Sequence, residues 1–195
     1  IRVWPKSDQS VGHVSIETNK YYISLWPQDG AGKPKIKWYS YEGALKSSLE
    51  EDLTANGTID RDGNITDKDP NPEIILNMLD EEAINNEFDK FKSSDELKWV
   101  LIGNNKLFLK DGVHSCASLA AHLLKVGGIE KTLSKLPLDV LNKEEYSAFD
   151  KFVHDKIIST PFNVEMVAKM AQRAENIITK ENVINHNGDR KNSSK

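Results

Sequence analysis

The sequence has 195 residues, with 26 basic side chains against 30 acidic ones and a formal net charge of −4. This length suits one domain with a sizeable core, or one domain with a small appendage. The lysines are dispersed among carboxylates and no apolar run is long enough to cross a bilayer, so we expect neither a nucleic-acid partner nor stable membrane insertion. A single cysteine excludes an internal disulfide framework.

A β-hairpin is predicted near the N-terminus. The segment 11–18 alternates apolar and polar residues, 21–26 has a similar strand-like composition, and Asn19-Lys20 between them provides the turn. His13 lies on the polar side of the first strand. The segment 27–34 is rich in Gly and Pro and therefore ends the regular structure.

The middle of the chain is predicted to mix strands, helices and loops. A strand is expected over 36–41 and a short helix over 42–53, followed by a long polar loop. Beyond Pro72, apolar residues recur at helical spacing and predict a helix over 74–92. The run 97–102 indicates a buried strand.

The one cysteine of the chain begins a predicted helix. A loop over 104–113 precedes it, and the amphipathic stretch that starts at Cys116 ends at Gly127-Gly128, a strong stop signal. A thiol at a helix start is exposed to the positive end of the helix dipole and to unpaired N–H groups, which favour the thiolate. Cys116 is therefore a candidate nucleophile; the alternative is a buried thiol that only packs.

His13 is the preferred general base among five histidines, since a strand histidine is free to meet a cysteine on a distant helix. The other four have simpler explanations: His114 is too close to the cysteine in sequence to be positioned freely, although it can line the site, His122 lies off the cysteine's helix face, His154 belongs to a charged helical stretch, and His186 to a polar tail. A purely structural role for His13 remains the alternative.

The C-terminal part is predicted to be helical. Amphipathic helices are expected over 143–158 and 164–178, with Thr160-Pro161 marking the break between them. Their apolar faces are expected to pack on the core rather than to bind a partner. The polar composition from residue 185 onward predicts a disordered tail.

An acidic segment over 58–69 partly follows the calcium loop of an EF-hand, with four matching positions: Asp60, Asp62, Gly63 and Ile65. Thr58 replaces the first aspartate, Asp69 replaces the bidentate glutamate, and Pro70 disfavours an exiting helix. We therefore expect a solvated acidic turn, in which Asp and Asn bond their own backbone, and no metal.

Three features together resemble the circularly permuted papain-like cysteine hydrolases, a superfamily that includes permuted NlpC-like cell-wall peptidases and lecithin retinol acyltransferase-like enzymes. They are His13 in Gly-His-Val-Ser-Ile, the second hairpin strand with its ending Ser24-Leu-Trp26-Pro, and Ser115-Cys116 at the start of a helix. In the permuted branch the histidine strand precedes the cysteine, as it does here. The resemblance covers about 11–27 and 113–128, and the insertion between them carries no recognised motif.

The chain departs from the family pattern at two positions. In the acyltransferase-like branch a second histidine commonly stands where Ser24 is found, and serine orients an imidazole without supplying negative charge. Glu17, on the strand face of His13, is the alternative partner for the base. The family often has asparagine before the cysteine, and Ser115 replaces it, so the surroundings of the oxyanion are left open.

The resemblance implies acyl transfer without a cofactor. His13 takes the thiol proton, Cys116 attacks a carbonyl, and a thioester intermediate is resolved by water or another acceptor. Ser24 is the expected third catalytic residue, Trp26 is positioned to wall the substrate cleft, and the Cys116 N–H is expected to donate to the oxyanion. The substrate implied is a peptide or protein, cleaved at a peptide, isopeptide or amide bond.

The implied fold is α+β: a permuted papain-like core with a small antiparallel sheet packed on the cysteine helix, plus C-terminal helices. The core is expected over 1–135 with an insertion near 29–72, the helical extension over 136–184 and the tail over 185–195. We expect a monomer, secreted by a bacterium and acting as an effector in a host cell. Two alternatives stay open: an acyltransferase or lipid hydrolase with the same dyad, and a non-catalytic binding module.

Overall fold

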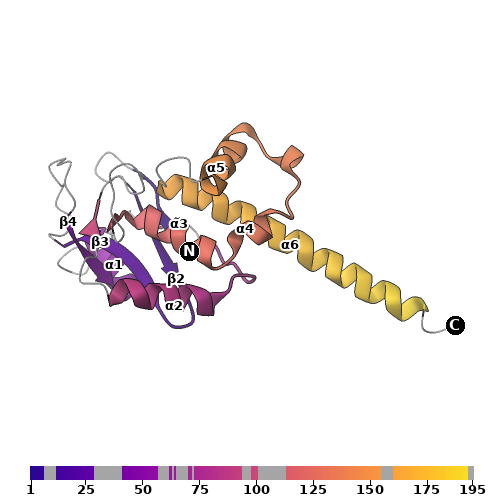
Figure 1. Ribbon diagram of the computed structural model, residues 1–195, viewed down its shortest axis with the longest axis horizontal. Helices are drawn as coiled ribbons and strands as arrows, with labels where there is room; N and C mark the ends of the chain where they lie inside the picture. The colour runs from indigo at the N-terminus through magenta and orange to yellow at the C-terminus, as the bar shows by residue number, and fades with distance from the viewer. Residues whose placement is uncertain are drawn as a thin grey trace.

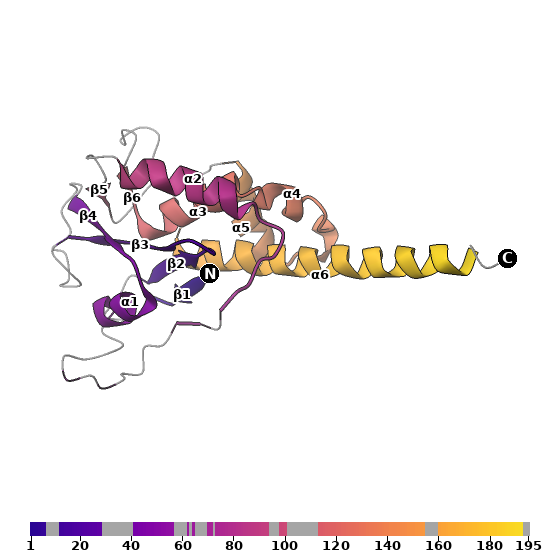
Figure 2. The same cartoon turned by 90° about the horizontal axis from the view of Figure 1, so that it is seen from below.

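The computed structural model describes residues 1–6, 12–28, 41–56, 62, 64, 70–71, 73–93, 98–100, 113–154 and 160–192. Within these residues the protein is α+β, as predicted, with helices packed around one twisted sheet (Figures 1 and 2). The predicted calcium-like loop over 58–69 lies outside the described residues, except for Asp62 and Asn64. No described helix has the length and apolar character needed to span a membrane.

The strands of the described residues form one sheet whose spatial order equals the chain order. Its members are β1 (Arg2–Trp4), β2 (His13–Glu17), β3 (Tyr22–Pro27), β4 (Tyr41–Lys46), β5 (Lys98–Trp99) and β6 (Val113–His114). Neighbours from β1 to β5 run antiparallel, and β6 is parallel to β5. The parallel strand β6 leads directly into the helix that starts at Cys116.

The predicted hairpin is confirmed as β2 and β3. Ile16 faces Ile23 across the pair, and the turn is closed by a hydrogen bond from the Thr18 N–H to the Tyr21 carbonyl at 2.8 Å. Because side chains alternate along a strand, His13 and Ser15 point to one face of β2 while Val14 and Ile16 point to the other. Val14 and Ile16 are part of the hydrophobic core.

The helix predicted over 42–53 is wrong in its first half. Residues 41–46 form β4, which pairs with β3 in the register Leu25–Leu45, and helix α1 covers Leu49–Ala55. Ser48 caps this helix by accepting a hydrogen bond from the Glu51 N–H. For residues 41–46, pairing with β3 outweighs a weak local preference for helix. Of the strand predicted over 36–41, only Tyr41 lies in the described residues.

The helix predicted over 74–92 begins later than expected. Helix α2 covers Glu81–Lys92, and Asp80 caps it by accepting from the Ala83 N–H at 2.9 Å. The chain before it is not helical: Ile74 is buried in the core, and its N–H donates to the Ile1 carbonyl at 3.0 Å. Leu76 and Leu79 also pack against the core, whereas Ile75 and Met78 are exposed. Helical periodicity alone does not distinguish such a non-helical segment from a helix.

The cysteine helix is confirmed. Helix α3 covers Cys116–Val126 and ends at Gly127, as predicted. Ser115 and Ser118 form a reciprocal capping box, each hydroxyl accepting from the other's N–H, at 3.1 and 2.8 Å. Leu119 and Leu123 of this helix lie in the same hydrophobic core as Val14 and Ile16 of β2, so the sheet packs on the cysteine helix.

The C-terminal part is helical, with short elements that the sequence did not predict. Its elements are α4 (Ile129–Leu133), the 3-10 turn η1 (Leu138–Val140), α5 (Lys143–Val153) and α6 (Pro161–Asn192). Val167 and Met170 of α6 are fully buried in the core. The helix continues to Asn192, through the region where a tail was predicted from 185, and its C-terminal half extends beyond the sheet (Figures 1 and 2).

Candidate active site

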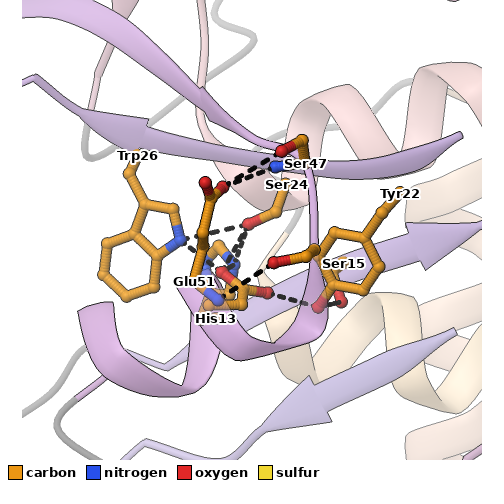
Figure 3. Close-up of polar contacts among 9 residues, drawn as sticks. His13, Ser15, Tyr22, Ser24, Trp26, Ser47 and Glu51 are labelled. Atoms are coloured by element: carbon orange, nitrogen blue, oxygen red, sulfur yellow. Dashed lines mark hydrogen bonds and ion pairs between the residues drawn. The ribbon is translucent and has the colours of Figure 1, made fainter.

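His13 is enclosed at the start of β2. Only 2 % of the residue is exposed, and its ring stacks on Trp26 of β3 with centroids 4.2 Å apart and planes at 29°. Trp4 of β1, paired with His13 across the strands, lies on it at 5.4 Å. Figure 3 shows His13 beside Ser24 and Trp26. The two indoles restrict the imidazole to a narrow range of orientations.

The Nε2 atom of His13 faces a serine and a carboxylate. It lies 2.8 Å from Ser24 Oγ, across the hairpin, and 3.2 Å from Asp52 Oδ1 on α1. Ser24 was the predicted third residue, and it does contact the imidazole. Asp52 was not predicted, and it places a negative charge directly behind the serine.

Asp52 is a fully buried carboxylate held by side chains of β3. Ser24 Oγ donates to its Oδ1 at 2.6 Å, Trp26 Nε1 donates to the same oxygen at 2.5 Å, and Tyr22 Oη donates to Oδ2 at 2.7 Å. Burial alone would raise the pKa of this carboxyl. Its hydrogen bond and charge interaction with His13, together with the Ser24 and Trp26 bonds, lower the pKa below its ordinary value.

These contacts define where the protons lie. Ser24 has one hydroxyl proton, which goes to Asp52, so its lone pairs accept from His13 Nε2–H and from Trp26 Nε1–H at 3.0 Å. With Nε2 directed at Ser24 and Asp52, Nδ1 is the other ring nitrogen of His13. A histidine whose far nitrogen is held by a carboxylate is oriented for proton transfer at the near one.

Cys116 also interacts with His13. Burial by itself lowers the pKa of His13, but the charge of Cys116, hydrogen bonds to Asp52 and Cys116, and the charge of Asp52 outweigh it and raise the pKa to about 9. The imidazolium form is therefore favoured at neutral pH. Cys116 itself is only half-buried, so a reagent or substrate can reach it.

The backbone around Cys116 leaves a donor available. Cys116 is the first residue of α3, and its N–H has no hydrogen-bond partner in the part of the chain that the structure describes. The capping box uses the N–H groups of Ser115 and Ser118 instead. An unpaired N–H beside the thiol is what an oxyanion requires.

Three of the predicted supporting residues lie elsewhere. Glu17 forms an ion pair with Arg2 at its exposed end of β2, so it is not the partner of His13. Ser115 acts as the helix cap. His114 packs against Phe91, with ring centroids 5.1 Å apart, and its Nδ1 lies 3.4 Å from Ser118 Oγ.

Trp26, for which a place in the wall of the substrate cleft was predicted, stacks on His13 and also lines a hollow. The hollow has a volume of about 350 Å³, and its wall includes Lys46 of β4 and Glu50 and Thr54 of α1. The indole thus contacts His13, hydrogen-bonds Asp52 and borders open space.

Two further histidines, His122 and His154, pair with carboxylates. His122 Nε2 lies 2.9 Å from Glu87 Oε1, and His154 Nδ1 lies 3.0 Å from Asp150 Oδ1. Among the described residues, no cluster of His, Cys, Asp and Glu side chains has an arrangement that would hold a metal ion. The residues that converge are thus Cys116, His13, Ser24 and Asp52, with Trp26 against them.

Asp52 was missed because its helix was predicted to start too early. It is the third of three consecutive acids in the first turn of α1, which in sequence is typical of a solvated helix start. The signal that would have found it is Ser48, whose role as N-cap sets the helix phase and separates Asp52 from its exposed neighbours Glu50 and Glu51.

No protein-family model matches this sequence, and comparisons with curated proteins and with solved structures find no significant similarity. The functional argument therefore depends on the geometry of the site itself.

Proposed function

We propose that the protein is a cysteine hydrolase that cleaves a peptide, isopeptide or amide bond through Cys116 and His13. The observation that carries the proposal is the continuous arrangement of a half-buried thiol, an imidazole and a buried carboxylate, with Ser24 between the last two. A nucleophile, a base and a group that orients the base are the parts that covalent acyl transfer needs.

In the proposed mechanism, the proton of the Cys116 thiol passes to His13 and forms the imidazolium that Asp52 stabilises. The sulfur attacks the substrate carbonyl carbon, and the carbonyl oxygen becomes an oxyanion that accepts from the Cys116 N–H. The carbon–nitrogen bond then breaks, the leaving amine takes the proton from His13, and a thioester remains on Cys116. Water adds to the thioester carbonyl and its proton passes to His13. The carbon–sulfur bond then breaks, the carboxylic acid product is released, and the proton on His13 returns to the Cys116 sulfur.

Asp52 has the role that the sequence left unassigned. Its carboxylate stabilises the imidazolium form of His13 through Ser24 and directly, since the Asp52 oxygen lies 3.2 Å from Nε2. Ser24 transmits the contact and Asp52 supplies the charge. The proposed set is therefore Cys116, His13, Ser24 and Asp52, in which a serine stands between the base and its carboxylate.

The fold assignment proposed with this mechanism is a permuted papain-like core. Its supports are the order of the elements, with the histidine strand before the cysteine helix, and the packing of α3 on β2 and β3. Secretion by a bacterium, action in a host cell and a monomeric state stay predictions of the sequence.

The test is the rate of Cys116 alkylation by iodoacetamide at pH 6, where an ordinary thiol is about 0.3 % thiolate. We expect fast labelling in the parent chain and a loss of about a hundredfold in His13→Ala and in His13→Gln, the latter filling more of the buried site. His122→Ala is the control, because His122 lies on α3 with Cys116 but pairs with Glu87 and not with the site. Equal labelling rates in the parent and both His13 variants would contradict the proposal.

If the thiol is activated, peptide, isopeptide and amide substrates are then compared, with Cys116→Ala as the inactive reference. Release of an amine with accumulation of an acyl-enzyme whose mass corresponds to a thioester is the expected result.

A further inference from the structure

The two oxygens of Asp52 have different surroundings. Oδ1 faces His13, Ser24 and Trp26, whereas Oδ2 accepts from the phenol of Tyr22 at 2.7 Å. The carboxylate has no exposed surface. Its orientation toward the imidazole therefore depends on what holds the second oxygen.

Tyr22 is held in turn by Ser15. Ser15 Oγ lies 2.9 Å from Tyr22 Oη and is 1 % exposed. Since the one phenol proton goes to Asp52, the Ser15 hydroxyl is the donor to Tyr22. Burial and the Asp52 charge raise the pKa of the Tyr22 phenol well above its usual range, so it stays protonated and remains a donor. Figure 3 shows Ser15 and Tyr22 together, on the side of His13 opposite Trp26 in this view.

We propose that Tyr22 is a positioning residue of this site, which fixes the Asp52 carboxylate so that its other oxygen points at Ser24 and His13. The inference rests on the proposed function and extends it by one residue. Without the phenol, Oδ2 would be a buried acceptor that has lost this donor, so the carboxylate would be held through Oδ1 and would take up a proton more readily.

The charged groups around Tyr22 and Asp52 come from the sheet and from α3. His13 of β2 lies on the Oδ1 side, Cys116 of α3 interacts with His13, and Arg2 of β1 lies over the Tyr22 ring at 5.9 Å. Arg2 is itself paired with two glutamates, Glu17 and Glu73, which reduces its effect on the phenol.

The variant Tyr22→Phe removes the hydroxyl and keeps the ring that contacts Arg2. Its measurement is the alkylation rate of Cys116 from pH 3 to pH 9. Loss of a donor raises the pKa of Asp52, so the carboxylate is neutralised at higher pH, and the acidic limb of the profile is expected to move up by about one pH unit. The rate on the alkaline side of the profile is expected to stay within about twofold of the parent.

The matched control is Tyr21→Phe. Tyr21 is the neighbouring residue of the hairpin, and its hydroxyl donates to Asp89 on α2 at 2.5 Å, away from His13. This variant should keep the parent profile. A thermal denaturation curve of each variant shows whether the fold is retained.

Two results overturn the inference. If Asp52→Asn slows labelling while Tyr22→Phe leaves the acidic limb in place, the positioning role is wrong and the proposed function stands. If labelling is indifferent to His13→Ala and to Asp52→Asn, the proposed function fails and the role of Tyr22 fails with it.

Discussion

Asp52 and Glu175, two buried carboxylates of this protein, differ in their hydrogen-bond partners: side chains for Asp52 and backbone N–H groups for Glu175. Asp52, with no exposed surface, contacts the side chains of His13, Ser24, Trp26 and Tyr22. Glu175 of α6, 4 % exposed, accepts from the backbone N–H groups of Asn77 and Met78 at 2.8 to 3.0 Å. Both are satisfied, as buried charges must be.

The difference shows that burial of a charge does not by itself indicate chemistry. The partners of Glu175 are amides that do not titrate, so this carboxylate fastens the extended segment before α2 to α6. Asp52 has an imidazole as its partner, and that imidazole continues to a half-buried thiol. A carboxylate acts in catalysis when its charge changes the protonation of a group that a substrate can reach.

The largest difference is expected when each carboxylate is replaced by the neutral amide of the same shape. We expect Asp52→Asn to slow alkylation of Cys116 at pH 6 by about a hundredfold, because the imidazolium loses its counter-charge. Glu175→Gln should leave the rate within about twofold of the parent and lower the free energy of unfolding by about 1–3 kcal/mol. Both variants are measured by Cys116 labelling rates and by urea denaturation. An equal loss of Cys116 reactivity in the two would contradict the different roles of Asp52 and Glu175.

A smaller effect is expected from Ser24→Ala. The direct approach of Asp52 Oδ1 to Nε2 at 3.2 Å survives this change, while the shorter contact through the serine is lost. Reactivity at pH 6 should fall by about tenfold, between the parent and Asp52→Asn. The comparison uses the same alkylation assay, and a loss as large as that of Asp52→Asn would mean that the carboxylate acts only through Ser24.

The smallest effect concerns stability against pH. The pKa of Asp52 is lowered in the folded protein, so the stability that this charge contributes is present above the unfolded value of about 3.9 and is lost as the pH falls through the lower folded value. The difference in unfolding free energy between the parent and Asp52→Asn, about 1–3 kcal/mol at pH 6, should therefore shrink below pH 4. Urea denaturation at pH 6, 4 and 3 checks it; a constant difference would argue against a charged Asp52.

Several parts of the site could be predicted because they depend on short stretches of chain. His13 and Ser24 are neighbours through one hairpin, and alternation of apolar and polar residues sets the face of each strand. Cys116 begins a helix because Ser115 and Ser118 form its cap three residues apart. Glu17 was weighed as the acid on the same local grounds, and the pairing with Arg2 of another strand turned it to a different role.

The sequence by itself determined the start of the cysteine helix and the hairpin that carries His13, since hydrogen bonds and periodicity within a few residues are sufficient for these. Only the tertiary structure decided that residues 41–46 form a strand and that Asp52 is the buried acid. The first depends on pairing with β3, and the second on donors contributed by β2 and β3, about 25 to 40 residues away in the chain. Contacts between distant segments leave no local pattern in the sequence, so the pairing of the Asp52 carboxylate with His13 could be identified only from the fold.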